Sequence, residues 1–590
     1  MIDTEVARTF DRRSALFLSA GAVLTSVLIL RMLQMQVFSY RTYKHKSESN
    51  LFRVRLDVAP RGRILSARKT PISRDKKIYR IYIVPEEARD INATLDAAAA
   101  DLKLSSRAIE KIRATIRKQP RFQPVLISDN SAWDALAKLQ ARNLPGLHVS
   151  GGYGRAYEMG PAGAQIFGYV GTPKRAIAGA PFMTVGTAGM ERKFEDTLSG
   201  TPGRTVMTTN AVGRVTGTDE AQSTAPIPGH DIHTTIRDDA QRAMYDALTA
   251  AGPGCGVALD IATGDILAMV STPSFDPNKF NADDAEKYIA NLRRDMGKPF
   301  MNKTIEGLYP PGSTFKIVVA LAALESGAVG PNEKISCPGH WDYGDRRYHC
   351  WKASGHGAVD LAGALAHSCD IYFYQIALRI GIDAIRAMAL KLGLGEKYMD
   401  DILSREMPGV IPDRRWKEKN IGYSWVHGDT IISGIGQGFV LTNCLQLAVM
   451  TARAVSNRCV VPRLIYGAAP DFDALNLQQK NIDAVMRGLE RVTRTGGTAA
   501  GAAINVRGAR MGGKTGTAQV RSISKAERES GVLTNEQLKW YMRNHGLFVG
   551  YAPTTNPRYA VAIITEHSGG STQASTAAAA VMKTLLNGEK

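Results

Sequence analysis

Cysteine is scarce in this chain of 590 residues: only six are present, and the first of them is Cys255. No two are spaced as a CxxC pair, the arrangement found in many zinc and redox sites. Small secreted domains held together by disulfides carry a far higher density of cysteine. The sequence therefore excludes a disulfide scaffold and predicts about two to four domains, each with a hydrophobic core.

Acidic residues are also in deficit, because 55 Asp and Glu face 74 Lys and Arg, which leaves a net charge of +19. Such an excess suits nucleic acid, an anionic membrane surface or polyanionic wall material. The sequence lacks a basic helix with interleaved aromatic residues and lacks a nucleic-acid motif. We therefore expect no nucleic-acid partner.

Long hydrophobic runs are absent except near the N-terminus. The stretch SALFLSAGAVLTSVLIL, residues 14–30, contains no charge, and apolar residues continue after a single arginine. This predicts a transmembrane helix over residues 14–36 behind a short cytoplasmic tail, residues 1–13. A cleaved signal peptide is the alternative, since the small residues at 20–22 resemble a cleavage site, but the apolar run continues beyond them.

The rest of the chain divides into two regions that differ in composition and pattern. Residues 37–220 are polar and punctuated by Gly and Pro, with short strand-like runs such as IYRIYIV (78–84). From about residue 221, two stretches each pair apolar runs across a turn signal, GVALDIATGDILAMVSTPS and HGLFVGYAPTTNPRYAVAIITEHS, as β-hairpins do. Helical patterns lie between and after them. An antiparallel sheet with helices packed on it, an α+β fold, is the expected architecture.

Three short motifs carry the chemistry, and the first is YPPGSTFK. A Pro-Pro-Gly turn leads into Ser313 and Lys316, and the i, i+3 spacing places both on one face of a helix start. The amine can then reach the hydroxyl, and the unpaired N–H groups of the helix start suit a developing oxyanion. An SxxK match by itself often occurs by chance.

The other two motifs are SCD at 368–370, at an expected helix start, and KTG at 514–516, in a glycine-rich strand. Glycine lets a substrate backbone lie along the edge of such a strand. Each motif also has an ordinary reading, as a polar cap or a turn with a lysine. In this order, SxxK, SxD and KTG together resemble the motif set of the penicillin-interacting serine acyltransferases.

The resemblance covers nearly the whole chain. The N-terminal anchor, the PRGRI element (60–64), the segment GTAGMERKFEDTLSG (186–200) and the three motifs are similar to class B penicillin-binding proteins. GVIPDRRWKEK and GDTIISGIGQGFVLTNCLQLA resemble the penicillin-binding protein 2 subgroup, which acts in cell elongation. Two positions depart from the family pattern. LSARKTPIS replaces the usual acidic-Asn-Gly sequence after PRG, and Asp370 replaces the more common Asn, as it does in the elongation subgroup.

The resemblance implies an anchor, an elongated mixed α/β non-catalytic region of the dimerisation type, here called the pedestal (37–220), and a transpeptidase domain (221–590). That domain is expected to hold a five-stranded antiparallel sheet sandwiched by helices. The boundary is expected in STAPIPGHDIHTTI, where Pro density and a strand start coincide. The implied location is the inner membrane, with a single pass and a periplasmic catalytic domain.

The implied activity is a peptidoglycan D,D-transpeptidase that cross-links stem peptides through an acyl-enzyme during cell-wall elongation. Ser313 attacks the penultimate D-Ala carbonyl, Lys316 is its base, and Ser368 relays a proton to the leaving amine. Lysine has an ordinary pKa of ~10.4, so a nearby cation, Lys514, is expected to lower that of Lys316, and Asp370 helps to position the network. The expected substrate-binding residues are Thr515, Gly516 and Thr517, with the backbone N–H groups of Ser313 and Thr517 as the oxyanion hole. β-Lactams are expected to acylate Ser313, and the chemistry requires no cofactor.

The implied partners are a membrane glycosyltransferase of the shape, elongation, division and sporulation family and other elongation-complex proteins, bound through the pedestal. The division-specific transpeptidase of the same family is the nearest alternative. A β-lactamase would need a water-activating base that the sequence does not offer, and a β-lactam sensor would need further membrane spans.

Three of the cysteines and one histidine follow the pattern C-x12-C-x5-H-x12-C, and they are Cys337, Cys350, His356 and Cys369. Three thiols and an imidazole suit tetrahedral Zn²⁺, and a structural zinc is predicted there. His349 and Asp342 are the reserve ligands. The alternatives are a Cys337–Cys350 disulfide in an oxidising periplasm, and Cys369 as a small buried hydrophobe.

Overall fold

The structure is a computed structural model. It describes residues 4–41, 52–129, 133–173, 175, 177, 180, 182–209, 215–281, 284–468, 470–521, 527 and 531–588. Two compact units divide the chain. The first comprises Met1–Pro60, Pro173–Met183 and Gly200–Pro228, and the second comprises Arg61–Thr172, Thr184–Ser199 and Gly229–Lys590.

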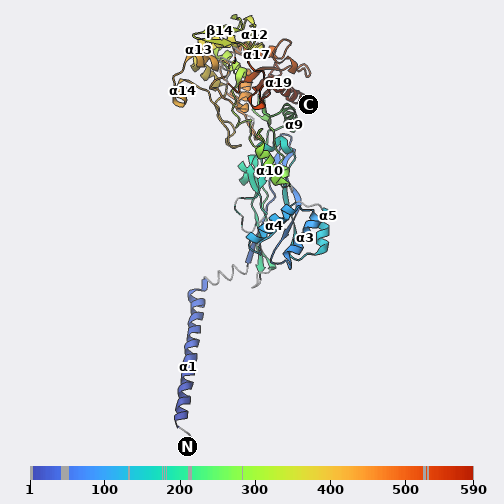
Figure 1. Ribbon diagram of the computed structural model, residues 1–590, viewed down its shortest axis with the longest axis vertical. Helices are drawn as coiled ribbons and strands as arrows, with labels where there is room; N and C mark the ends of the chain where they lie inside the picture. Colours follow the sequence, from blue (N-terminus) through green and yellow to red (C-terminus); the bar gives the residue numbers. More distant parts are fainter. Residues whose placement is uncertain are drawn as a thin grey trace. The chain divides into compact units, whose positions relative to one another are not determined.

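The first unit contains the predicted membrane helix, α1 (Thr4–Leu33), drawn in dark blue in Figure 1 and continued by a π-helix over Gln34–Phe38. Within it, Arg13–Phe38 has a mean hydropathy of 2.0, and none of its most apolar part is buried. In the described part of the chain, this is the one helix long and apolar enough to cross a membrane. The same unit holds an antiparallel sheet of order β1-β8-β9, formed by Phe52–Asp57, Gly203–Thr209 and Val215–Thr224.

The second unit begins with a mixed sheet of order β10-β2-β3-β4, in which β5 also pairs with β3. These strands are β2 (Ile64–Leu65), β3 (Pro71–Ile83), β4 (Val125–Asp129), β5 (Leu147–Tyr157) and β10 (Ile232–His233). The run IYRIYIV accordingly lies almost entirely in β3. Three helices share a small core with this sheet and appear in blue in Figure 1. They are α3 (Ile91–Leu102), α4 (Ser106–Lys118) and α5 (Trp133–Arg142).

A set of buried and half-buried charged side chains lies in this part of the second unit. We call it the arginine–glutamate cluster: Arg61, Asp75, Arg155, Glu191 and Glu195. The Glu191 carboxylate accepts from Arg61 at 2.6 Å and from Arg155 at 2.7 Å. Arg61 also contacts Glu195 at 2.7 Å, and Arg155 contacts Asp75 at 3.1 Å. The segment GTAGMERKFEDTLSG that contains both glutamates reads as one helix from the sequence. It forms two, α7 (Gly189–Lys193) and α8 (Glu195–Leu198), because Phe194 leaves helical geometry.

The part of the second unit that carries the three motifs is built on a five-stranded antiparallel sheet of order β12-β11-β19-β18-β17. The strands are β11 (Gly254–Asp260), β12 (Ile266–Thr272), β17 (Gly512–Ala518), β18 (His545–Ala552) and β19 (Tyr559–Thr565). Alternate residues face opposite sides: Val257 belongs to one core cluster and its neighbour Ala258 to the other. The predicted α+β class and the five-stranded antiparallel sheet are confirmed.

Helices cover both faces of this sheet. On one face α9 (Asp238–Ala251) and α19 (Thr572–Asn587) share a core with it, and on the other face the buried helices are α11 (Lys316–Glu325), α13 (Asp370–Lys391) and α16 (Cys444–Ser456). Arg237 occupies the N-cap of α9. The second unit also contains α10 (Ala285–Arg294), β13 (Ile335–Cys337), β14 (His340–Tyr343), β15 (Arg346–His349), β16 (Gly357–Val359), α12 (Leu361–Ala366), α14 (Arg414–Ile421), α15 (His427–Ser433) and α17 (Gln479–Val492).

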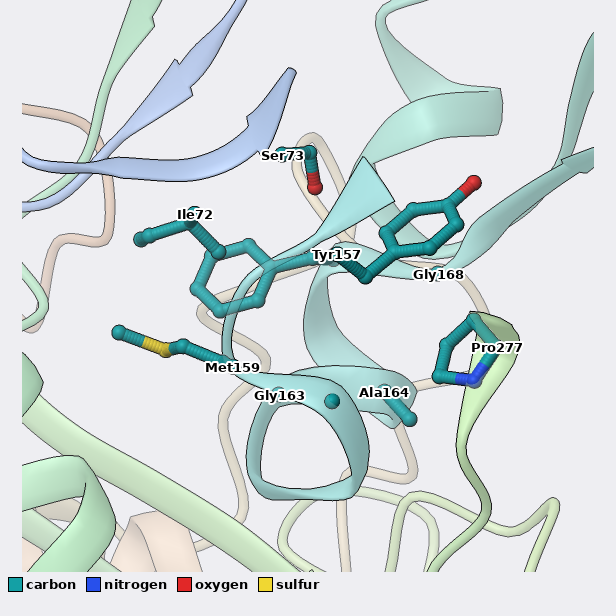
Figure 2. Close-up of a pocket in the computed structure, with 10 residues that line it drawn as sticks. Ile72, Ser73, Tyr157, Met159, Gly163, Ala164, Gly168 and Pro277 are labelled. Atoms are coloured by element: carbon teal, nitrogen blue, oxygen red, sulfur yellow. The ribbon is translucent and has the colours of Figure 1, made fainter. Parts of the chain in front are cut away.

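A small cavity lies in the second unit, between the start of β3, the end of β5 and the turn that follows it (Figure 2). Its volume is about 10 Å³, roughly the space of one water molecule. The hydroxyl of Ser73 in its lining is buried and has no hydrogen-bond partner among the described residues. The cavity is too small to hold a substrate.

Candidate active site

Ser313 and Lys316 lie where a turn becomes a helix. Ser313 is half-buried in the 3-10 turn Gly312–Phe315, and Lys316 is the fully buried first residue of α11. The turn needs glycine at 312, because that residue has φ +52° and a Cβ there would lie 2.5 Å from the Thr517 carbonyl oxygen. Sequence spacing correctly placed the serine and the lysine at a helix start.

The Lys316 amine joins the first motif to the second. Its Nζ donates to the Ser368 carbonyl oxygen at 3.0 Å, lies 3.2 Å from Ser368 Oγ, and contacts Asp370 Oδ1 at 2.7 Å. Ser368 has φ +56°, and Asp370 is the first residue of α13. The left-handed turn at Ser368 thus presents both its oxygens to one amine, although the two motifs are 52 residues apart.

Asp370 uses its second oxygen elsewhere. Asp370 Oδ2 accepts the backbone N–H of Trp351 at 3.0 Å, while the indole of Trp351 is 62% exposed and donates to the His367 carbonyl. A carboxylate held by both oxygens has little rotational freedom. The sequence did not reveal this contact, because a backbone N–H leaves no signal in residue type.

Lys514 is fully buried on β17, the edge strand of the catalytic sheet. Burial, followed by the positive charge of Lys316, lowers the pKa of Lys514 well below its ordinary value, and the charge of Asp370 opposes this only in part. Its Nζ donates to the Thr515 carbonyl at 3.2 Å. Two lysines and one carboxylate therefore share a space from which water is largely excluded.

The other residues of the third motif line the same strand. Thr515 is buried, and its hydroxyl lies 2.7 Å from that of Thr498. Gly516 packs closely on the nucleophile turn, where a Cβ would lie 3.1 Å from the Pro311 carbonyl oxygen. Thr517 is exposed, and its carbonyl oxygen accepts from Gln437 Nε2 at 2.9 Å. Sequence reasoning missed Thr498 and Gln437, and for Gln437 the available signal was its position between two glycines.

The four predicted metal ligands also lie together. Cys337, Cys350, His356 and Cys369 present one ligand atom each, and these atoms all lie within 4.8 Å of one another. His356 Nδ1 is 3.6 Å from Cys337 Sγ and 3.5 Å from Cys350 Sγ. Bonds of ~2.3 Å to sulfur and ~2.0 Å to nitrogen at tetrahedral angles would separate such atoms by about 3.6 Å. The donor set therefore fits zinc in chemistry and in size.

The thiols of this cluster are free, and so are the other cysteines of the chain; the alternative Cys337–Cys350 disulfide is not formed. A hydrogen bond from Cys369 lowers the pKa of the Cys350 thiol to about 5, and a thiolate is the form that binds metal. The reserve ligands do not belong to the group found among the described residues. Asp342 instead pairs with Arg347 at 2.7 Å on the surface.

The chain matches two known family models. The penicillin binding protein transpeptidase domain matches residues 254–587, and the penicillin-binding protein dimerisation domain matches residues 56–234. The chain belongs to the class B penicillin-binding proteins. The resemblance stated from the motifs is therefore confirmed.

Curated class B relatives match over almost the full length. Peptidoglycan D,D-transpeptidase MrdA of Haemophilus influenzae is 33% identical over 607 residues, covering 98% of this chain and 92% of the relative. MrdA of Escherichia coli K12 is 30% identical over 620 residues, covering 99% and 96%. The predicted function, a peptidoglycan D,D-transpeptidase of the elongation type, is confirmed by these matches.

Solved class B structures are also similar. The penicillin-binding protein PBP2 of Pseudomonas aeruginosa in complex with WCK 5153 has a TM-score of 0.65 and 29% identity, with 91% of this chain and 97% of that chain covered. The complex of PBP2 and MreC from Helicobacter pylori has a TM-score of 0.76 and 23% identity, with 91% and 99% covered. The second similarity supports the fold alone.

Proposed function

We propose that Ser313 is the nucleophile with which this transpeptidase cross-links stem peptides. Ser313 Oγ attacks the carbonyl carbon of the penultimate D-Ala and loses its proton to Lys316. The bond to the terminal D-Ala breaks, and Ser368 relays a proton to the departing amine. The amino group of a second stem peptide then attacks the acyl-enzyme, which forms a 4→3 cross-link and frees Ser313. A β-lactam would stop at the acyl-enzyme.

One observation carries this proposal: Lys316, from the nucleophile helix, contacts both polar residues of the second motif. Asp370 compensates its charge and holds it beside Ser368. Burial and the charge of Lys316 lower the pKa of Lys514 well below its ordinary value, which favours its neutral, proton-accepting form. Both lysines belong to one proton network. Lys316 is assigned as the base, and the lowered pKa of Lys514 suits Lys514 to the role of modulator, which takes up the proton that Lys316 must lose before it can act.

The edge of β17 is the proposed substrate strand. In a strand, the N–H and C=O of one residue point to the same side. The Thr517 carbonyl faces Gly312 and Gln437, so the Thr517 N–H faces the nucleophile turn as well. With the Ser313 N–H it forms the proposed oxyanion hole. Thr515 and Gly516 complete the subsite, the former through its hydroxyl and the latter by leaving room for the peptide.

Covalent labelling tests the assignment. Ser313→Ala is expected to abolish labelling by fluorescent penicillin and to leave the melting temperature within a few degrees of the wild type. The matched control is Ser326→Ala at the far end of α11, where the hydroxyl bonds only within the helix, and it should label normally. Labelling of the Ser313 variant would contradict the assignment. Sustained nitrocefin turnover by the wild type would favour the β-lactamase alternative.

Zinc is the proposed occupant of the cysteine–histidine cluster. Cys369 stands between Ser368 and Asp370, and Cys350 precedes Trp351, so two ligands flank residues of the proton network. A bound metal would cross-link the hairpin region to the start of α13 and supply folding energy, without entering the chemistry. The metal content of protein purified without chelator, with Cys369→Ser for comparison, tests this.

The membrane anchor and the partner-binding surface are both assigned to the non-catalytic region. The apolar α1 supports a single pass through the inner membrane, with residues 1–13 in the cytoplasm and the catalytic domain in the periplasm. The region of residues 56–234, which matches the dimerisation domain, is proposed to bind the membrane glycosyltransferase and other elongation-complex proteins. Cross-linking of the full chain in membranes should map to that region. Partner cross-links confined to residues 254–587 would contradict this assignment.

A further inference from the structure

Gln437 makes a contact that the proton network does not explain. Its Nε2 donates to the carbonyl oxygen of Thr517 at 2.9 Å, and that carbonyl lies on the open edge of β17. Gln437 itself is half-buried, in the loop that follows α15. A long polar side chain is therefore ordered against the same residue that supplies the proposed oxyanion donor.

The backbone around Gln437 is fitted closely to the nucleophile turn. Gly436 and Gly438 have φ of +69° and +75°, so the loop holds the glutamine between two residues in the left-handed region that favours glycine. The Gly312 N–H donates to the Gly436 carbonyl at 2.9 Å. A Cβ at Gly436 would lie 2.3 Å from the Gly312 carbonyl oxygen. The loop and the turn are thus in direct backbone contact.

Three segments consequently meet at the reacting centre: the nucleophile turn, the loop of Gln437, and β17. The turn meets the loop through Gly312 and Gly436, and the Gln437 carboxamide joins the loop to β17. An oxyanion donor acts only if it lies within about 2.7–3.1 Å of the oxygen. A displacement of about 1 Å can cost ~10²-fold in rate. The acylation rate should therefore depend on how accurately the Thr517 N–H is oriented relative to Ser313.

We propose that Gln437 is a positioning residue for acylation, whose carboxamide holds Thr517 so that its N–H meets the oxyanion formed on attack by Ser313. This inference rests on the proposed function of Ser313. The carboxamide donates a hydrogen bond and carries no charge, so it restrains the strand without adding another cation or anion to the two lysines. Its effect should fall on the acylation rate constant rather than on the initial binding of the β-lactam.

The test measures acylation of the full-length, detergent-solubilised protein by fluorescent penicillin. Gln437→Met keeps the length and removes the donor, and it should lower the acylation rate constant ~10–100-fold with less change in the noncovalent dissociation constant. Gln165→Met is the matched control, because Gln165 also donates to a backbone carbonyl at 2.9 Å, that of Pro299. The control should acylate within twofold of the wild type.

Gln437→Glu adds a readout that a purely structural role would not move. Ionised, the carboxylate cannot donate to Thr517, but protonated, it can donate through its O–H. The ratio of its acylation rate to that of the wild type should rise as the pH falls from 8 towards 4.5, near the ordinary glutamate pKa of ~4.3.

A flat ratio over this pH range, or a Gln437→Met variant within twofold of the wild type, would overturn the proposal. If Gln437→Met also loses thermal stability, the pH dependence of Gln437→Glu decides between a positioning role and a purely structural role. Failure of the underlying function is recognised separately, because Ser313→Ala would then still be labelled.

Discussion

The second unit contains two clusters of charged side chains that are shielded from water, and they differ in how their cations are paired. In the arginine–glutamate cluster, two arginines face three carboxylates, and Glu191 is bound by both guanidinium groups. In the active site, two buried lysines face one carboxylate, and Lys514 has no acidic partner of its own among the described contacts. Buried charge is tolerated when it is paired and hydrogen-bonded. The cluster in which each cation has a carboxylate partner serves structure, while in the active site burial and Lys316 lower the pKa of the unpaired Lys514, as proton transfer requires.

Removing the unpaired cation, Lys514, is the strongest test of the difference between the two clusters. Lys514→Met should slow acylation by about 10²–10⁴-fold, the usual range for a lost acid–base group, and yet raise the melting temperature at pH 7. Folding depresses the pKa of Lys514, so between the folded and unfolded pKa values the unfolded chain binds more protons and stability rises with pH.

The stability gained in the Lys514 variant should therefore be complete below the folded pKa and shrink as the pH rises towards ~10.4, the ordinary lysine pKa. Thermal melts of both proteins between pH 6 and 10 measure this. A lower melting temperature for the variant at pH 7 would mean that Lys514 is stabilising, and that the two clusters do not differ as described.

Removing a charge from the arginine–glutamate cluster should instead destabilise the protein. Glu191→Gln leaves two buried guanidinium groups short of a carboxylate and should lower the free energy of unfolding by about 3–5 kcal/mol, with little direct effect on the chemistry of acylation. Urea denaturation measures the change. The matched control is Glu286→Gln, since Glu286 also pairs with two basic side chains, Arg107 and Lys111, but on the surface. The control should melt within about a degree of the wild type.

Removal of metal is the smallest of the three effects. Chelation should destabilise the folded protein by about 3 kcal/mol if the metal had been present at a hundredfold excess over its Kd. Acylation should slow modestly, because Asp370 and Trp351 lose part of their support. Calorimetry before and after chelation, with zinc added back, measures both. If chelator does not change the melting temperature and Cys369→Ser is as stable as the wild type, these thiols serve only as packing residues.

Sequence reasoning succeeded where the signal was local or belonged to a recognisable family. Ser313 and Lys316 are three residues apart, so helix geometry alone placed them. The paired apolar runs of the two hairpins predicted the sheet, and the clustered cysteines with His356 predicted their own convergence. Bringing Ser368 and Lys514 to Lys316 required the resemblance, because contacts across 50 to 200 residues have no signature in spacing. The domain boundary near residue 220 stays a prediction.

The residues that the sequence did not yield share a physical reason. Trp351 acts through its backbone N–H, which every residue except proline has. Thr498 and Gln437 are ordinary polar residues whose partners lie on a distant strand. Phe194 broke an expected helix because tertiary contacts of the flanking glutamates with Arg61 outweighed local periodicity. In each case the deciding interaction is non-local.

In the described part of the chain β17 is an edge strand of its sheet, and this has a consequence for solubility. Open strand edges are where sheets from different molecules join and aggregate. This edge must stay accessible to a peptide, so covering it with another strand is excluded. Instead, three of its seven residues are glycine, which is depleted in strands, and Gln437 already occupies the carbonyl oxygen of Thr517. β-Branched residues at those glycines would strengthen pairing with a second copy as well as close the approach to Ser313, so resistance to self-association and access for the peptide are set by the same short strand.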